Sequence, residues 1–311
     1  MSTDDRTPPV AVVDGEPTIL RQRATWVMLA SVVALVVLWM VFIQLEWGQR
    51  LDDLAIESRT VESPAAISQN STALNLVTNA SLALGCIVFL VVGFVRRRPL
   101  LGLAAVCSVG AATVTTEILK RIVIDRPIRF VEAPDLVDNT FPSGHATIST
   151  ALALAALMVT PVRWRAHVAV VGALWVTFQC TGVVSAGWHR PSDALAGLAV
   201  ALGWAAFAVL MLALLRRVER ADTEGNDERG AHWILLVLAF VLVALVLSVV
   251  IAGDSPWSWG GIDFLIASAV IDIAGVAVVV VMLALLRGCS LGRRVGGHGS
   301  AGSANSAPTI G

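Results

Sequence analysis

The chain is 311 residues long, 56% hydrophobic and only 14% charged, with a net charge of −1 at pH 7. Soluble domains carry about a quarter charged residues, so this composition excludes an ordinary soluble globule and indicates a polytopic membrane protein. No basic tract or aromatic-interleaved basic patch is present, and we predict no nucleic-acid partner. The four cysteines form no CxxC pair and are interpreted as small apolar residues rather than as disulfides or metal ligands.

Residues 1–24 are polar and contain three prolines, which predicts a disordered cytoplasmic tail. The next run, 26–45, is about 20 residues long, enough to cross a hydrocarbon core of about 30 Å as a helix. Further apolar runs follow along the chain. The sequence therefore predicts an all-α, polytopic membrane helix bundle of eight spans, at 26–45, 73–95, 100–118, 146–162, 167–186, 194–215, 233–252 and 264–286.

Arginines are concentrated at alternate ends of these spans. Cytoplasmic ends carry the excess of Lys and Arg in membrane proteins, so we predict that these ends and both termini are cytoplasmic in a multi-pass protein of the cell membrane. The opposite ends are predicted to be extracytoplasmic. The arginines are Arg21, Arg23, Arg96, Arg97, Arg98, Arg163, Arg165, Arg216, Arg217, Arg287, Arg293 and Arg294.

A charged linker at 218–231 divides the predicted spans into two groups. We predict a six-span domain at 25–217, a two-span hairpin at 232–287 and a disordered cytoplasmic tail rich in Gly and Ser at 288–311. Asp272 lies inside the last span, where an unpaired carboxylate is costly. We interpret it as a neutral acid bonded to a neighbouring helix, with an arginine partner or a bound polar group as alternatives.

The extracytoplasmic segment 48–71 contains a short amphipathic pattern followed by a region rich in Ser and Thr. Asp52 and Asp53 lie between Leu51, Leu54 and Ile56, a spacing that allows one short surface helix over a site. We expect a plain loop here and keep the helix as the alternative.

The stretch from Phe141 to His145 ends a polar loop and opens an apolar helix. Ser143 is a good helix cap, and Gly144 lets a ligand approach backbone N–H groups that have no partner within the helix. A phosphate there would meet the positive end of the helix dipole beside His145. The alternative is a capped membrane helix with a histidine at the interface.

Lys120 is the single lysine of the chain, and it lies with Arg121 at an outer helix end, where positive charge is normally depleted. Arg126 and Arg129 follow closely, so four cations can face the same zone as His145. Snorkelling cations that anchor a helix end are the alternative.

A very short turn joins the fifth and sixth predicted spans and contains His189 and Asp193. Their separation of four residues lets the carboxylate hold the imidazole in one tautomer and raise its basicity. His189 is then a candidate nucleophile, with His145 as the acid that protonates the departing oxygen. A zinc site built from the two histidines and Asp193 is a weaker interpretation, because the nearby cations would repel the metal.

These motifs resemble those of the type 2 phosphatidic acid phosphatase and vanadium haloperoxidase superfamily. Its Pro-Ser-Gly-His motif matches residues 142–145, and its histidine-to-aspartate motif matches His189 and Asp193. Its first motif is matched loosely by Lys120 and Arg126-Pro127, which have five intervening residues where the family has six. The resemblance covers about residues 50–215.

The resemblance implies a six-helix phosphatase core and metal-independent, cofactor-free hydrolysis of a phosphomonoester or diphosphate through a phosphohistidine. It implies that Lys120, Arg126, Ser143 and Gly144 bind phosphate oxygens. Eight spans argue against the mostly soluble haloperoxidase branch. An extracytoplasmic site at headgroup level predicts a lipid phosphate or polyprenyl diphosphate of the outer leaflet as substrate.

One family residue is missing. The family has an arginine six residues before its nucleophilic histidine, and this chain has Val183 there. We expect Arg129 or Arg190 to supply the guanidinium, with Arg129 favoured because its loop has more reach. The alternative is a catalytically inactive protein that binds lipid phosphates.

Overall fold

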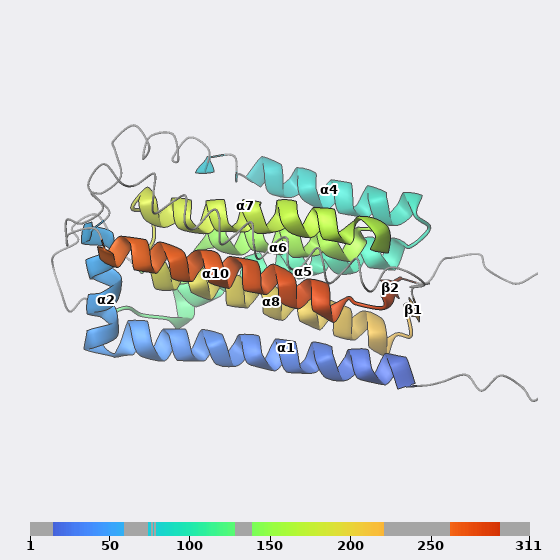
Figure 1. The fold of residues 1–311 in the computed structure, drawn as a ribbon, viewed down its shortest axis with the longest axis horizontal. Coiled ribbons are helices and arrows are strands. Elements are labelled where there is room, and N and C mark those ends of the chain that lie inside the picture. The colour runs from blue at the N-terminus through green and yellow to red at the C-terminus, as the bar shows by residue number, and fades with distance from the viewer. Residues whose placement is uncertain are drawn as a thin grey trace, which may run out of the picture.

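The structure is a computed structural model that describes residues 15–58, 74–75, 77, 79–127, 139–220 and 262–292. These residues form a mostly helical bundle whose long helices run along one axis (Figure 1). The long helices are α1 (Gly15–Trp39), α4 (Asn79–Val95), α5 (Pro99–Ile118), α6 (Gly144–Val159), α7 (Arg165–Ser185), α8 (Pro191–Leu214) and α10 (Ile262–Leu285).

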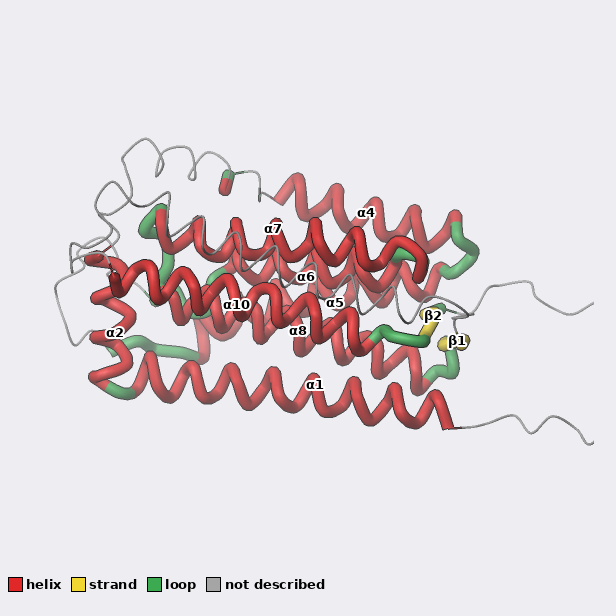
Figure 2. The backbone as a smooth tube through the Cα atoms, viewed as in Figure 1, coloured by secondary structure: helices red, strands yellow, loops and turns green. Residues whose placement is uncertain are grey.

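Shorter elements complete the two ends of the bundle. The helix α2 (Glu46–Glu57) lies across one end, and the strands β1 (Val218–Arg220) and β2 (Cys289–Leu291) pair antiparallel at the other (Figure 2). Wider π-helical turns, Met40–Gln44 and Leu119–Val123, extend α1 and α5 towards the α2 end, and a short 3-10 helix, Val162–Trp164, precedes α7.

Five of the described helical segments are long and apolar enough to cross a membrane, and the chain is a multi-pass membrane protein. They are Thr18–Gln44, Pro99–Val123, Val162–Ser185, Pro191–Leu214 and Ile262–Leu285, and two shorter apolar helices are Ala80–Val95 and Gly144–Val159. Each predicted span except 233–252 corresponds to one of these helices. That span lies outside the described residues, so the predicted total of eight remains a prediction.

Three boundaries differ from the sequence-based expectation. The first helix begins at Gly15, inside the expected tail, because Leu20 and Ala24 are buried one turn apart and Arg21 donates to the Ala213 carbonyl of α8. Residues expected as linker and tail form β1 and β2. The segment 48–71, expected as a loop, contains most of α2, whose buried face carries Gln49, Asp52 and Asp53 beside Ala55 and Ile56.

Small residues bring the helices close together. A Cβ at Gly197 of α8 would lie 3.0 Å from the Ser143 carbonyl oxygen at the start of α6. Between α4 and α5, a Cβ on Gly102 would lie 2.7 Å from the Phe89 carbonyl oxygen, and one on Gly93 would lie 2.8 Å from the Gly102 Cα. Backbones at this separation gain van der Waals contact that larger side chains would prevent.

The last helix belongs to the same bundle as the preceding ones. It packs on α7 and α8, and Asp272 accepts a hydrogen bond of 2.7 Å from the Thr181 hydroxyl of α7. This is the neighbouring-helix bond expected for that carboxyl group. At the strand end, Arg165 donates to the carbonyls of Leu286 and Cys289, at 2.9 and 2.7 Å, and so ties α7 to the end of α10.

Candidate active site

Four helix ends meet beneath α2 and carry the polar residues singled out in the sequence. They are the end of the π-helical turn after α5, with Lys120, the start of α6, with Ser143 to His145, the turn after α7, with His189, and the start of α8, with Asp193. The starts of α6 and α8 present N–H groups without partners within the helix, and Lys120 lies at the end of the extended α5. The fold therefore brings together residues that are about 70 positions apart in the chain.

The start of α6 is fixed by its own cap and by α8. Ser143 is fully buried, and its hydroxyl accepts from the Ala146 N–H at 3.3 Å, as expected for a helix cap. Its own N–H donates to the Asp193 carbonyl at 2.9 Å. The preceding Phe141 is buried in a small apolar cluster with Ile43 and Ala196. The packing of Phe141 and the hydrogen bond from Ser143 to α8 thus fix the loop that presents Gly144 and His145.

His189 and Asp193 form the pair expected from their spacing. The imidazole Nδ1 lies 3.4 Å from Asp193 Oδ2, and both side chains are buried. The same carboxylate oxygen accepts from the Arg190 N–H at 3.0 Å and from the Thr140 hydroxyl. The His189 N–H donates to the Val183 carbonyl at 3.2 Å. A carboxylate on Nδ1 leaves Nε2 as the nitrogen that can attack an electrophile.

His145 lies at the same end, half-buried, with its ring centroid 5.3 Å from the Trp188 ring. It is close enough to His189 and Lys120 to interact with both electrostatically. Lys120 Nζ would lie 3.9 Å from a Cβ at Gly144, so the ammonium group faces the start of α6. These three groups and the Gly144 N–H therefore surround one location.

Arg126 is buried among carboxylates. Its Nη2 lies 3.4 Å from Asp52 Oδ2, and its Nη1 lies 3.6 Å from Asp193 Oδ1. Within the described part of the chain, Nη1 has no hydrogen-bond partner although it is buried, and neither does Asp193 Oδ1. A buried guanidinium nitrogen with a spare N–H is suited to an anionic ligand.

Asp52 and Asp53 of α2 contact residues of the candidate site, and the sequence did not lead us to assign them to it. Asp52 accepts from the Ser192 N–H at 3.0 Å and from the Ser192 hydroxyl, and Asp53 accepts from Arg190 Nε at 2.7 Å. Both carboxylates are buried against the start of α8. The signal available in the sequence was a pair of acidic residues opposite a predicted cluster of cations.

The two α2 carboxylates change the charge of the site. Lys120, Arg126 and Arg190 now face the carboxylates Asp52, Asp53 and Asp193, and Glu117 is a further carboxylate beside Lys120. Burial raises the pKa of the Asp52 carboxyl to about 7, the nearby Asp193 carboxylate adds to the rise, and Arg126 and Ser192 oppose it. The charge beside Arg126 thus changes near neutral pH.

The remaining predicted residues are placed as follows. Arg190 is directed to Asp53 of α2, while Arg129 lies outside the described residues. Val183 is fully buried in α7, in agreement with its apolar character, and leaves no cation on that face of the site. Arg121 faces outward and pairs with Glu117 at 2.7 Å. Among the described residues, no group of three or more His, Cys, Asp or Glu side chains could hold a metal ion.

These features define a membrane helix bundle with a histidine–aspartate pair, a second histidine and buried cations at one end. Residues 101–217 match the family model described as the PAP2 superfamily. This part of the chain is similar to that superfamily, as its motifs predicted, and the match together with the apolar helices indicates a membrane phosphatase. No curated protein and no solved structure matches the chain significantly.

Proposed function

We propose that the protein is an integral-membrane phosphatase that hydrolyses a lipid phosphate or polyprenyl diphosphate of the outer leaflet at an extracytoplasmic site. The observation that carries the proposal is the pairing of His189 Nδ1 with the buried Asp193 carboxylate, 3.4 Å apart, beside a second histidine and a buried arginine with a spare N–H. This is the arrangement that nucleophilic catalysis by histidine requires.

The proposed reaction has two steps. His189 Nε2 attacks phosphorus, the bond from phosphorus to the leaving oxygen breaks, and His145 protonates that oxygen while Asp193 stabilises the charged imidazole through Nδ1–H. Water then attacks the phosphohistidine, with His145 as the base, and releases inorganic phosphate. Lys120, Arg126, Ser143 and the Gly144 N–H stabilise the negative charge on the phosphoryl oxygens in both transition states.

Loss of the nucleophile tests this mechanism. In detergent-purified protein assayed with a panel of lipid phosphates, His189→Ala or His145→Ala should reduce phosphate release by about 10³-fold or more. His167→Ala is the matched control, because His167 lies near the other end of α7, beside Trp164. Normal release by the His189→Ala protein would overturn the mechanism, and loss of wild-type activity on addition of a chelator would redirect it to a metal.

The intermediate can also be detected directly. Rapid quenching of wild-type protein with a radiolabelled substrate should trap phosphate on His189, in a bond that is labile to acid and stable to alkali. The His189→Ala protein should carry no such label. Label on a serine or aspartate, which has the opposite stability, would contradict the proposal.

The missing arginine concerns the same transition state. We infer that Arg129 or Arg190 replaces the guanidinium absent at Val183, with Arg129 favoured, since Arg190 Nε already bonds to Asp53. Losing the residue that acts should cost about 2–4 kcal/mol of transition-state stabilisation. Turnover of Arg129→Ala, Arg190→Ala and Val183→Arg, measured separately, tests this. Full activity in both alanine variants would leave Lys120 and Arg126 as the only cations at the phosphate.

A second function is favoured by one observation. Val183 is buried and apolar where the family has a phosphate-binding arginine, which fits a protein that binds lipid phosphates without cleaving them. Binding that depends on Lys120 and Arg126, with no phosphate released from any member of the panel, would establish this function. Release at a rate typical of enzymes would eliminate it.

A further inference from the structure

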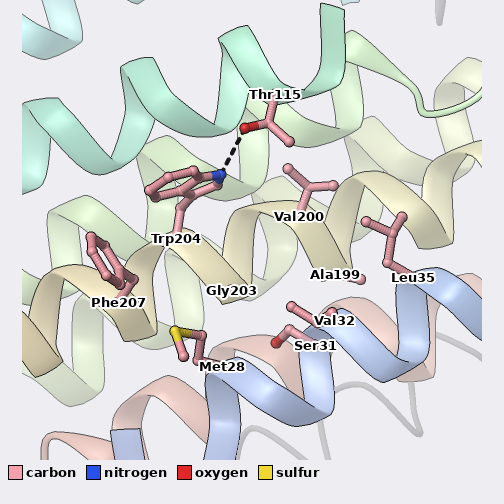
Figure 3. Close-up of a pocket in the computed structure, with 10 residues that line it drawn as sticks. All are labelled: Met28, Ser31, Val32, Leu35, Thr115, Ala199, Val200, Gly203, Trp204 and Phe207. Atoms are coloured by element: carbon pink, nitrogen blue, oxygen red, sulfur yellow. Dashed lines mark hydrogen bonds between the residues drawn. The ribbon is translucent and has the colours of Figure 1, made fainter. Parts of the chain in front are cut away.

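An apolar groove lies between α1, α5 and α8 (Figure 3). It encloses about 280 Å³. Met28, Val32 and Leu35 of α1 form one wall, and Trp204 and Phe207 of α8 form another. Val32 and Phe207 are partly exposed, so no residue in the described part of the chain covers this side of the groove.

The polar atoms of the lining are already bonded within the protein. Trp204 Nε1 donates to the Thr115 hydroxyl at 2.9 Å, which joins α8 to α5 at the groove (Figure 3), and the Ser31 hydroxyl donates to the Val27 carbonyl at 2.8 Å. The lining therefore offers mainly dispersion contacts, and each of its side-chain polar groups already has a partner in the protein. A hydrocarbon chain matches this chemistry, whereas a polar ligand would lose its own hydrogen bonds with water.

One side chain packs both in the groove and below the candidate active site. Leu35 lines the groove and also packs against the cluster of Ile43, Phe141 and Ala196, which supports the loop that presents Gly144 and His145. On α8, Ala199 is six residues after Asp193, which is about 9 Å along a helix, and Phe207 is about 21 Å along it. Half of a hydrocarbon core is about 15 Å thick, so the groove begins in the leaflet on the side of the active site and extends about 6 Å past the middle of the bilayer.

From these observations we propose that the groove binds one hydrocarbon chain of the lipid phosphate whose phosphate group lies at His189. This inference rests on the proposed function and adds to it the site that determines which substrate chain lengths are preferred. Leu35 is then the residue that links headgroup and chain sites, and Trp204, held by Thr115, forms a fixed wall of the groove. A second copy of the chain, or residues 233–252, are the other groups that could cover this surface.

Filling the groove tests the proposal. Gly203 lines it, and a Cβ there would lie 3.4 Å from Ser31 Cβ, so Gly203→Leu places a side chain in the groove. We expect kcat/KM for a C16 lipid phosphate to fall by about tenfold relative to kcat/KM for p-nitrophenyl phosphate, which has no chain. The matched control is Gly110→Leu, since Gly110 of α5 is exposed and has no atom within 4 Å of a built Cβ. An unchanged ratio in folded Gly203→Leu protein would overturn the proposal.

A binding measurement covers the case in which Gly203→Leu does not fold, and separates this proposal from the proposed function. A lipid phosphate with a diazirine in its chain is photolysed with the His189→Ala protein, and labelled residues are mapped by mass spectrometry. We expect label on Val32, Leu35 and Phe207 that unlabelled lipid phosphate displaces. Label spread evenly over exposed residues of α4 would refute the groove. Crosslinks from a photoreactive residue at position 32 to residues 233–252 or to a second copy would refute it as well. Absence of phosphate release by wild-type protein, with groove labelling intact, would refute only the enzyme.

Discussion

Asp52 is the buried carboxyl of α2 that lies between the start of α8 and Arg126. Burial raises its pKa to about 7 from an ordinary value of 3.8. Between pH 3.8 and about 7, Asp52 is therefore protonated in the folded protein and ionised in the unfolded chain. Stability contributed by this group is present at low pH and is lost as the pH rises towards 7. An acidic residue placed here is a cost to the fold above neutral pH.

We accordingly predict that the apparent Tm in detergent falls less between pH 5 and pH 8 in the Asp52→Asn protein than in wild type. The amide keeps an acceptor for the Ser192 N–H and cannot ionise. Glu57→Gln, which removes an exposed carboxylate from the same helix, should retain the wild-type pH dependence. Thermal unfolding followed by circular dichroism at both pH values provides the comparison, and equal slopes in wild type and Asp52→Asn would contradict it.

Thr140 is a positioning residue for the proposed reaction. Its hydroxyl donates to Asp193 Oδ2, the oxygen that faces His189. Thr140→Val keeps the shape and removes this donor, so Asp193 should hold the imidazole less firmly. We expect kcat to fall by about 10-fold with KM little changed, and rescue by Thr140→Ser. Thr177→Val, which removes a hydroxyl bonded to a carbonyl of its own helix, is the control. A loss confined to KM would point to a role in binding instead.

At the scale of the elements, close helix contact depends on glycine. Gly93 of α4 and Gly102 of α5 face each other with no room for a Cβ on either. In hydrocarbon, such contacts supply much of the packing energy between helices, because burial of apolar side chains gains little relative to lipid. The position of α5 matters for function, since Lys120 follows its last turn.

We predict that Gly102→Ala destabilises the bundle by about 1–3 kcal/mol, as expected for overpacking. The added Cβ would meet backbone atoms at 2.7 Å, and the backbone of α4 would have to move. Gly110→Ala is the matched control on the same helix, where the added methyl group meets no atom within 4 Å. Unfolding in mixed micelles of increasing SDS content measures both. Equal stability of Gly102→Ala and Gly110→Ala would show that α4 and α5 do not pack as described.

At the scale of the whole molecule, the two ends of the bundle differ in chemistry. The end with β1 and β2 carries Arg98 and Arg165, and the end with α2 carries the histidines and buried acid–base pairs. The arginine distribution predicts that the strand end is cytoplasmic. The proposed substrate would then approach from the outer leaflet.

Labelling of single cysteines in intact cells tests this orientation. In a background with the four native cysteines replaced, Arg121→Cys should react with a membrane-impermeant maleimide, because Arg121 is exposed at the α2 end. Arg163→Cys, in the turn before α7, should react only after the cells are permeabilised. The reverse pattern would place the site in the cytoplasm and exclude an outer-leaflet substrate.

The sequence by itself predicted the class of fold, the seven long helices that the structure describes and the motif residues of the candidate site. Apolar runs long enough to cross a bilayer can form only helices or closed barrels there, since backbone groups need partners within the segment. The spacing of His189 and Asp193 likewise predicted that their side chains pair, because a separation of four residues at a helix start places two side chains on one face. Both inferences rest on local geometry.

Only the tertiary structure decided how α2 completes the site and where the groove lies. Asp52 and Asp53 contact residues more than 70 positions away in the chain, and no local pattern specifies such partners. The long helices are apolar on every side, so their sequences carry no stripe that separates lipid-facing from buried faces. Which face of α8 meets α1, and therefore which residues line the groove, follows from close packing of all the helices at once.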